Sequence, residues 1–336
     1  MPIVLDAMGS DDHPIPEIAA AIEFAKSTGE KIFFVGNKDV IFRHASESDF
    51  AGLPIEVVHA EDILEMGEKA VKSTRAKPNN SMAIGLKLVR EGQAKAFVTA
   101  GNTGAAMFNS LRTLGRIKGV GRPALTTLFP TRKGHCIVLD IGANSDCRPE
   151  FLQQFAVMGS VYAEKMRGIR DPRVGLLNNG EEEGKGNELA RNTFPLLKEC
   201  GINFIGNVEA KDVFNDKADV VVTDGFTGNM LIKSSEAAAK MLTDLLKEGL
   251  MSSVSGKIAG LLAKPVFKGL KAKMDPNEIG AAPLLGIDGL SFVGHGRSDA
   301  TALINGMKQA KAAADMDLIA LISDALQSRL SEEERQ

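Results

Sequence analysis

The stretch that decides the fold is residues 220–229, VVVTDGFTGN. Four apolar or β-branched residues run directly into a turn built from Asp, Gly, Thr and Asn, and a helical pattern follows from Met230 to about Leu250. A buried strand that delivers a Gly-rich turn to a helix N-terminus forms an anion site, because unpaired backbone N–H groups and the helix dipole converge there. We therefore predict that this turn binds a substrate rich in oxyanions.

The chain carries a second copy of this turn. Residues 96–104 read AFVTAGNTG, so T-x-G-x-T-G occurs at 99–104 and again at 223–228, each time between a strand and a helix pattern. Thr, Asn and Gly are also good capping residues, so one copy alone is equally well explained as a helix cap. Two copies, each with an asparagine, favour a site that both turns share. The residues expected to contact the oxyanions are Asn102, Thr103, Gly104, Thr227, Gly228 and Asn229.

The remaining sequence alternates strand and helix patterns. Apolar strand patterns occur near residues 3–5, 31–35, 55–59, 96–99, 124–128, 136–139, 173–177, 203–206 and 219–223, with helical patterns between most of them. This alternation predicts an α/β fold with a doubly wound, mainly parallel sheet in three α/β/α layers. At 336 residues the chain suits one α/β catalytic domain over residues 1–336, or two lobes around a cleft. Residues 61–78 are polar and are expected to form a loop.

There is a weak sign of internal duplication. LDAMGSDD (residues 5–12) resembles LDIGANSD (residues 139–146), each at the end of a strand pattern. Loops of α/β proteins converge on similar chemistry, so both duplication and convergence are compatible with this likeness.

Composition argues against several classes of protein. Trp is absent and Tyr occurs once, so few aromatic side chains are available to stack on nucleic-acid bases. The formal net charge of −3 also argues against binding to a polyanion. The first residues contain no basic n-region, and no uncharged apolar run reaches about 18 residues, so neither a signal peptide nor a transmembrane helix is expected. The three cysteines form no C-x-x-C, which is typical of reduced cytosolic thiols. We expect a cytoplasmic enzyme that binds no nucleic acid.

The segment 252–273 differs from the rest, because it is basic and contains no acidic residue. An apolar stripe at helical spacing is flanked by lysines, and Pro265 is expected to break it. Such basic amphipathic segments lie on anionic membranes, bind acidic partners, or pack within the protein or a dimer. The residues expected to make these contacts are Val254, Lys257, Ile258, Leu261, Leu262, Lys264 and Phe267.

Lys185 is a candidate for anion contact. It lies in GEEEGKGNE (residues 180–188), which resembles a phosphate loop but lacks the spacing and the Ser or Thr of the Walker pattern, so nucleotide hydrolysis is not expected. A solvated lysine beside three glutamates is the structural alternative.

Other chemistry-bearing residues are scattered. No G-x-G-x-x-G opens a helix and the histidines lack zinc spacing, so neither a dinucleotide, a metal nor any other cofactor is expected. His295 is framed by glycines and suits either catalysis or packing. Asp6 suits Mg²⁺ binding or, preferably, the N–H groups of its own loop. Cys147 is a weak candidate for a nucleophile, and Asn144 and Asp224 are further candidates in polar turns.

From residue 5 to about 300 the chain carries a series of motifs, LDAMGSD, RAKPNNSM, AGNTGA, GRIKGVGRPAL, DIGANSD, QFAVMGS, LLNNGEEEGKG, GNVEAKDVF, DVVVTDGFTGNMLIK and GHGRSDA. This series resembles the bacterial phosphate acyltransferase family, the acyl-ACP:phosphate acyltransferases. Small departures lie in the N-terminal loop, in NNSM, and in IGAAPLLG, where the family has a Tyr-Gly-Gly run.

The resemblance implies transfer of a long-chain acyl group from acyl carrier protein to inorganic phosphate, which gives an acyl phosphate for phospholipid synthesis. It implies a homodimer with a fold like that of phosphotransacetylases and isocitrate/isopropylmalate dehydrogenases. It also implies peripheral association with the membrane, beside an integral glycerol-3-phosphate acyltransferase.

The chemistry agrees with the residues. Phosphate is largely dianionic near neutral pH and a thiolate is a good leaving group, so attack on a thioester requires positioning and oxyanion donors instead of a strong base. We assign phosphate to the two Thr-Gly turns, Lys185 and Arg75, with Asn229 or Asn102 facing the oxyanion. The alternatives are a phosphotransacetylase that uses coenzyme A, a related NAD-dependent decarboxylating dehydrogenase, and a membrane-associated scaffold without enzymatic activity.

Overall fold

The computed structural model describes residues 2–274 and 280–330. Its strands are β1 (Ile3–Asp6), β2 (Ile32–Gly36), β3 (Ile55–His59), β4 (Ala96–Thr99), β5 (Ala124–Pro130), β6 (His135–Leu139), β7 (Val174–Leu177), β8 (Phe204–Val208), β9 (Val220–Val222), β10 (Ala282–Leu285) and β11 (Leu290–Val293). Its helices are α1 (Ile15–Thr28), α2 (Lys38–His44), α3 (Glu47–Phe50), α4 (Ala70–Ala76), α5 (Ser81–Arg90), α6 (Thr103–Thr113), α7 (Pro149–Arg167), α8 (Glu188–Glu199), α9 (Ala210–Phe214), α10 (Gly225–Met251), α11 (Val254–Met274), α13 (Ala300–Asp315) and α14 (Leu318–Arg329).

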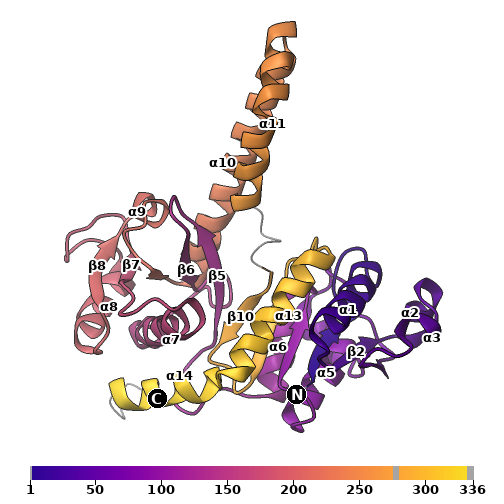
Figure 1. Cartoon of the computed structure of the whole chain (residues 1–336). Coiled ribbons are helices and arrows are strands. Elements are labelled where there is room, and N and C mark those ends of the chain that lie inside the picture. Colours follow the sequence, from indigo (N-terminus) through magenta and orange to yellow (C-terminus); the bar gives the residue numbers. More distant parts are fainter. Residues whose placement is uncertain (1, 275–279, 331–336) are drawn as a thin grey trace.

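The described strands form one sheet in the order β3-β2-β1-β4-β11-β10-β5-β6-β9-β7-β8. The first five strands are parallel to one another, and so are the last four. Between these two sets, β10 and β5 make antiparallel pairs. The two sets therefore run in opposite directions, and each forms the centre of one lobe (Figure 1). The mainly parallel α/β sheet is confirmed, with an antiparallel seam that the strand patterns did not reveal.

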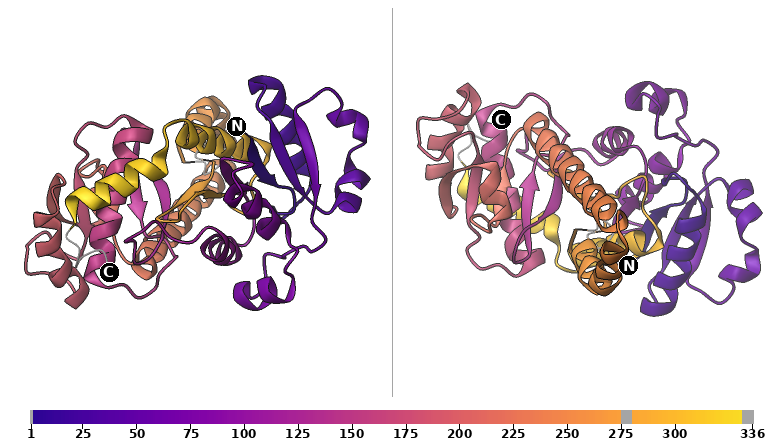
Figure 2. Two further views of the ribbon diagram at one scale, coloured as in Figure 1. Left: turned by 90° about the horizontal axis from the view of Figure 1, so that it is seen from below. Right: turned by 90° about the horizontal axis from the view of Figure 1, so that it is seen from above.

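Helices cover both faces of the sheet, as the three-layer prediction requires. One face packs against α1, α7, α8, α13 and α14 in the largest apolar cluster of buried residues. The other face packs against α5 and α6 in the N-terminal lobe, and against α9 and α10 in the C-terminal lobe. Figure 2 shows α13 and α14 running from one lobe to the other, since α13 packs on β4 and β11 and α14 packs on α7.

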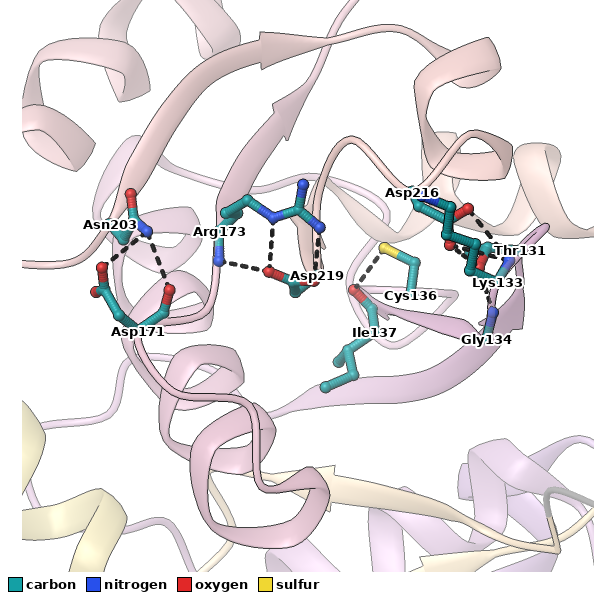
Figure 3. Close-up of polar contacts among 10 residues, drawn as sticks. All are labelled: Thr131, Lys133, Gly134, Cys136, Ile137, Asp171, Arg173, Asn203, Asp216 and Asp219. Atoms are coloured by element: carbon teal, nitrogen blue, oxygen red, sulfur yellow. Dashed lines mark hydrogen bonds and ion pairs between the residues drawn. The ribbon is translucent and has the colours of Figure 1, made fainter.

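The amino ends of the C-terminal-lobe strands are closed by paired polar groups (Figure 3). Arg173 donates from Nε and Nη2 to the two carboxylate oxygens of Asp219, each at 2.9 Å. Asn203 Nδ2 donates at 3.0 Å to the backbone and side chain of Asp171. These contacts tie the starts of β7, β8 and β9 together, so the opposite, carboxyl edge is the one that remains for a ligand.

Two predictions about helices are wrong. Residues 70–76 form α4 inside the segment expected to be a loop. Pro265 does not break the basic segment, because α11 continues through it as one helix. Proline removes one i→i−4 hydrogen bond, and packing of α11 along α10 in an antiparallel hairpin keeps the helix continuous (Figure 1).

The hairpin of α10 and α11 projects from the body of the protein (Figure 1). Val254, Ile258, Leu261 and Leu262 form its exposed apolar stripe, with exposed fractions of 58% to 76%. Phe267 is half-buried on the α11 face shared with Gly260, which packs against Leu250 of α10. The stripe is thus not used in packing within the chain. No helix in the described ranges is long and apolar enough to cross a bilayer.

The two copies of T-x-G-x-T-G begin their helices at different positions. In the second copy Asp224 is the N-cap, and its side chain accepts from Thr227 N–H. In the first copy the corresponding residue is Ala100, which cannot cap, so the helix starts two residues later with Asn102 as the N-cap. Thr227 and Gly228 therefore lie inside the first turn of α10, and Thr103 and Gly104 inside the first turn of α6.

Gly228 allows α10 to approach the 140–144 loop closely. A Cβ at this position would lie 1.9 Å from the carbonyl oxygen of Asp140, a contact that no side chain can make. A Cβ on Gly225 would similarly lie 2.7 Å from the carbonyl oxygen of Asn144. The glycines of the second motif are required first of all for packing.

We expect Gly228→Ala to lower the free energy of unfolding by roughly 1–3 kcal/mol or more, because the helix must move away from Asp140. The matched control is Gly249→Ala in the same helix, where an added Cβ meets nothing within 4 Å. That control should raise stability by about 0.5–1 kcal/mol through reduced chain entropy. Urea unfolding measures both values, and equal effects of the two substitutions would contradict the packing role.

Candidate active site

A deep cavity opens at the carboxyl ends of β7 and β9 in the C-terminal lobe. Its volume is about 1080 Å³, and its lining comes mainly from the β7–α8 loop, α8, α9 and α10. The inner wall reaches the core, since the lining residues Leu152 and Leu176 are only 2% and 1% exposed. Open α/β sheets bind ligands at this edge. We therefore take this cavity as the candidate active site.

Lys185 lies in the β7–α8 loop beside this cavity, although it is not itself one of the lining residues. The neighbouring Gly186 lines the cavity. The backbone carbonyl of Lys185 accepts a 3.0 Å hydrogen bond from Nδ2 of Asn178, another lining residue. Gly186 has a φ of +100°, and a Cβ there would lie 2.5 Å from Asn178 Oδ1, so this tight turn requires glycine. Lys185 is exposed and makes no ion pair with the residues that the structure describes. Its ammonium group is available to an anion.

The N-terminus of α10 is satisfied by the protein itself. Asp224 Oδ1 accepts from Thr227 N–H at 2.8 Å, and Oδ2 accepts from the Thr227 hydroxyl at 2.7 Å. Gly225 N–H donates to the carbonyl of Asn144 at 2.7 Å. A phosphate on this helix end would meet the carboxylate of Asp224 where the sequence predicted free N–H groups. The geometry favours an anion position beside the turn, nearer to Lys185.

Asn229 lies on the other side of α10 from the cavity. Thr227, Met230 and Leu231 line the cavity, whereas Asn229 lies over Gly142, about 4.0 Å from the position that a Cβ of Gly142 would occupy. The amide of Asn229 makes no hydrogen bond with another described residue, and the side chain is exposed. It is therefore a free donor at the first turn of the helix.

His295, which follows β11, belongs to the N-terminal lobe and lies within electrostatic reach of α10. Partial burial lowers its pKa, and the positive charges of Arg297 and of Lys233 on α10 lower it further. The imidazole is thus neutral at pH 7. Lys233 lies about one turn after Asn229, so this face of α10 is directed toward the N-terminal lobe.

The 99–104 turn does not line the cavity. Asn102 Oδ1 accepts from Ala105 N–H, while Nδ2 donates to the carbonyls of Met66 at 2.7 Å and Glu68 at 3.2 Å. Both amide hydrogens of Asn102 are thus engaged, and Thr103 and Gly104 are exposed in α6. The repeated motif predicted one site shared by both turns. The structure instead has a cavity that is lined by the second turn and not by the first.

Arg75 lies elsewhere as well. It lines a separate hollow of about 570 Å³ with Pro78, Phe108, Leu111 and Arg112. Its guanidinium carbon lies 6.0 Å from the centre of the Phe108 ring. Arg75 is therefore associated with the exposed side of α6 and not with Lys185.

Two buried aspartates organise the strand ends of the two lobes. Asp140 accepts hydrogen bonds from the N–H groups of Leu125, Gly142, Ala143 and Asn144, and from Asn144 Nδ2. Asn144 also donates to the carbonyl of Pro123, so its role is to hold this loop. Burial raises the pKa of Asp140, although these hydrogen bonds favour the charged form.

Asp6 is the equivalent residue at the end of β1. It accepts from Met8 N–H at 3.0 Å and from the Thr99 hydroxyl at 2.7 Å, and burial raises its pKa. These contacts agree with the interpretation that Asp6 satisfies its own loop. In both lobes a strand-end aspartate is adjacent to the first Thr of the Thr-Gly motif.

Sequence reasoning did not identify Glu17, which is fully buried in the first turn of α1. Its Oε1 accepts from Ser10 N–H at 2.8 Å, and its Oε2 has no hydrogen-bond partner. Burial raises its pKa to about 7, with a smaller contribution from Asp6. The sequence signal was weak, because an acidic residue in the first turn of a helix is ordinary.

The structure offers little support for covalent or metal chemistry. Burial, and then the charges of Asp140 and Asp224, raise the pKa of Cys147 to about 12, so its thiol is protonated at neutral pH. Glu181, Glu209 and Asp212 form an acidic group of the size of a metal site in the described residues. Lys217 makes ion pairs with two of them, at 3.0 Å and 3.2 Å, and so already supplies positive charge there.

Comparison with known proteins places this site in a family. A family model described as "Fatty acid synthesis protein" matches residues 1–321. The chain is 47% identical over 309 residues to a phosphate acyltransferase of Acidobacterium capsulatum, which covers 92% of each chain. It is 44% identical over 328 residues to a phosphate acyltransferase of Dictyoglomus thermophilum, which covers 97% of this chain and 98% of that protein. The chain belongs to the phosphate acyltransferase family. The predicted family is therefore confirmed, and it is a family of acyltransferases.

Solved structures confirm the predicted fold of this phosphate acyltransferase family member. The branched-chain phosphotransacylase of Enterococcus faecalis V583 matches with a TM-score of 0.59 at 13% identity, over 94% of this chain and 99% of that one. The EutD phosphotransacetylase of Staphylococcus aureus matches with a TM-score of 0.58 at 15% identity, over 93% and 94%. At these identities the likeness establishes the arrangement of the elements.

We expect Glu17→Gln to stabilise the protein at high pH. The folded state holds the Glu17 proton up to about pH 7, whereas the unfolded chain releases it near pH 4.3. The wild type therefore loses stability as pH rises through this window, by up to roughly 3–4 kcal/mol.

The free energy of unfolding at pH 5 and pH 8 measures this difference. Glu17→Gln should be the more stable protein at pH 8 and close to the wild type near pH 4.5. Glu23→Gln, an exposed position on the same helix, is the control and should follow the wild type. The account would be contradicted if the wild type gained stability relative to Glu17→Gln between pH 5 and pH 8.

Proposed function

We propose that the protein transfers a long-chain acyl group from acyl carrier protein to inorganic phosphate, forming an acyl phosphate for phospholipid synthesis. The observation that carries the proposal is a mostly apolar cavity at the carboxyl edge of the sheet, with Lys185 exposed in the adjoining β7–α8 loop and in no ion pair with the described residues. Membership of the phosphate acyltransferase family supports the same reaction.

The reaction requires little from the protein beyond positioning. An oxygen of phosphate attacks the thioester carbonyl carbon, the carbon–oxygen bond forms, and the carbon–sulfur bond breaks as the tetrahedral oxyanion collapses. The thiolate leaves without prior protonation because thiols have a pKa of about 8.5. Lys185, in the loop beside the cavity, attracts the phosphate dianion. Asn229 faces Gly142 on the opposite side of α10, so the predicted role of its amide as the oxyanion donor does not fit this cavity.

A phosphotransacetylase that uses coenzyme A is the second candidate, favoured by the likeness of fold to solved phosphotransacetylases. Purified protein incubated with phosphate and a hexadecanoyl thioester of either carrier distinguishes the two, with acyl phosphate trapped by hydroxylamine. Turnover with acyl carrier protein is expected. Turnover with coenzyme A alone would favour the second candidate, and none with either would refute both.

We also propose that the α10–α11 hairpin holds the enzyme at the membrane surface. Its exposed stripe of Val254, Ile258, Leu261 and Leu262 is free of intramolecular packing, and the exposed Lys257 and Lys264 carry the charge that an anionic bilayer attracts. Because an acyl phosphate avoids water, release there would pass it directly to an integral glycerol-3-phosphate acyltransferase. The same lysines could attract the acidic acyl carrier protein.

A homodimer completes the proposal. Met241 and Leu245 on α10 are 57% and 56% exposed and do not line the cavity. Apolar side chains on a projecting helix suit a contact with a second copy of the chain.

We expect Lys185→Ala to lower turnover by about 10²–10³-fold, because it removes a donor to the transferred phosphate. The control is Lys198→Ala, an exposed lysine whose ion pair with Glu183 is 2.9 Å long. Surface ion pairs contribute little, so the control should keep turnover within about twofold. Near wild-type turnover in folded Lys185→Ala would refute this role.

We expect Leu261→Glu to reduce binding to anionic phospholipid vesicles by at least about tenfold, since it removes an apolar group worth roughly 1.5–3 kcal/mol from the contact and adds negative charge. Activity in solution should remain. Ala237→Glu adds the same charge at an exposed position of α10 away from the tip and should bind almost as well as the wild type. Vesicle sedimentation measures this, and undiminished binding of Leu261→Glu would exclude the membrane role of the stripe.

A further inference from the structure

The candidate cavity extends far beyond the position where the reaction would occur. From Thr227 and Met230 it continues along α10, past Ala238, to Leu242 and Leu246. At roughly 1.5 Å of rise per residue, Thr227 and Leu246 are about 28 Å apart along the helix axis. A fully extended chain advances roughly 1.2 Å per bond, so a long fatty acyl chain of about 16 carbons fits within this length.

The lining changes along this path from polar to apolar. The strand ends contribute Asn178, Asn179, Thr223 and Asp224, whereas the outer part of α10 contributes small or apolar residues. The hydroxyl of Ser235 donates to the carbonyl of Leu231 at 2.7 Å. The hydroxyl of Thr243 likewise donates to the carbonyl of Ala239 at 2.8 Å. Both hydroxyls donate to the backbone of the helix, so the outer wall offers few free polar groups to a ligand.

Small side chains form the middle of this wall. Ser234, Ser235, Ala238 and Ala239 lie between the larger Met230 and Leu231 on one side and Leu242 and Leu246 on the other. A helix that leaves such a gap provides a shallow channel along its surface, because the small residues recur on one face at helical spacing. At the polar end, the channel meets the cavity rim beside Lys185.

We propose that this channel holds the acyl chain of the thioester substrate and that Ala238 lies beside the chain at a point that sets the accepted length. The inference rests on the proposed function, and it adds the binding mode and a specificity-determining residue. The carbonyl carbon lies near Thr227 and Lys185, and the chain runs along α10 toward the exposed end of the hairpin.

The shape of the cavity favours a chain over a helix of a second copy. Its outer part follows one helix, α10, from Thr227 to Leu246. The cavity also penetrates to Leu152 and Leu176 in the core, where a slender ligand reaches and a partner helix does not.

Ala238→Phe tests this assignment, with Ala237→Phe as the matched control. Both alanines are exposed, but only Ala238 lines the channel. Ala238 lies about 16 Å from Thr227 along the helix, which corresponds to roughly 13 carbons of an extended chain. With octanoyl, dodecanoyl and hexadecanoyl thioesters of acyl carrier protein, Ala238→Phe should lower kcat/KM at least about tenfold for hexadecanoyl and within about twofold for octanoyl. Ala237→Phe should stay within about twofold for all three.

A binding measurement separates this inference from the proposed function. Titration of hexadecanoic acid into each protein should show at least about tenfold weaker binding for Ala238→Phe and unchanged binding for Ala237→Phe. If the wild type forms no acyl phosphate but this binding pattern holds, the proposed function fails and the channel stands. Equal effects of Ala238→Phe on all chain lengths and unchanged hexadecanoic acid binding would overturn the channel. The channel would also be overturned if Ala238→Phe changed only the self-association measured by sedimentation, because that result would assign the surface to a second copy of the chain.

Discussion

The close approach of α10 to the 140–144 loop is the contact on which the rest of this structure depends. The buried carboxylate of Asp140 accepts hydrogen bonds from four backbone N–H groups and from the side chain of Asn144. These bonds hold the loop in one conformation. The first turn of α10 fits against this loop only because Gly228 has no Cβ. That fit sets the direction in which a helix of 27 residues leaves the lobe.

The direction of α10 creates the two features that carry function. One face of its first turns lines the cavity at the ends of β7 and β9. Its far end, beyond the body of the protein, supports α11 and its apolar stripe (Figure 1). The channel for an acyl chain lies along α10, and the surface for a membrane lies on the helix that α10 supports. Acyl transfer to phosphate suits such a design, because it needs alignment and charge more than acid–base catalysis.

The two lobes use the same motif for different purposes. Thr99 donates to Asp6, and Asn102 ties α6 to the 66–68 segment, so the first copy consolidates its lobe. The second copy borders a cavity that reaches the core. The two helices also begin at different positions, since Asp224 caps α10 and Ala100 cannot cap α6. Repetition of a motif therefore did not imply repetition of a site.

The sequence by itself determined the α/β fold, its largely parallel strands and the family, because alternating patterns and Gly-rich turns are local properties. It also proposed Lys185 and Asn229 as candidate site residues. Several things depended on contacts between distant segments and were decided only by the tertiary structure. Opposite strand directions in the two lobes meet at the β10–β5 seam, which places the Thr-Gly turns in different surroundings. Glu17 became a perturbed acid through burial, and Pro265 stayed helical through packing of α11 on α10. The cavity needed residues from α7 to α10 together, and no local pattern records which side chains will face one another across it.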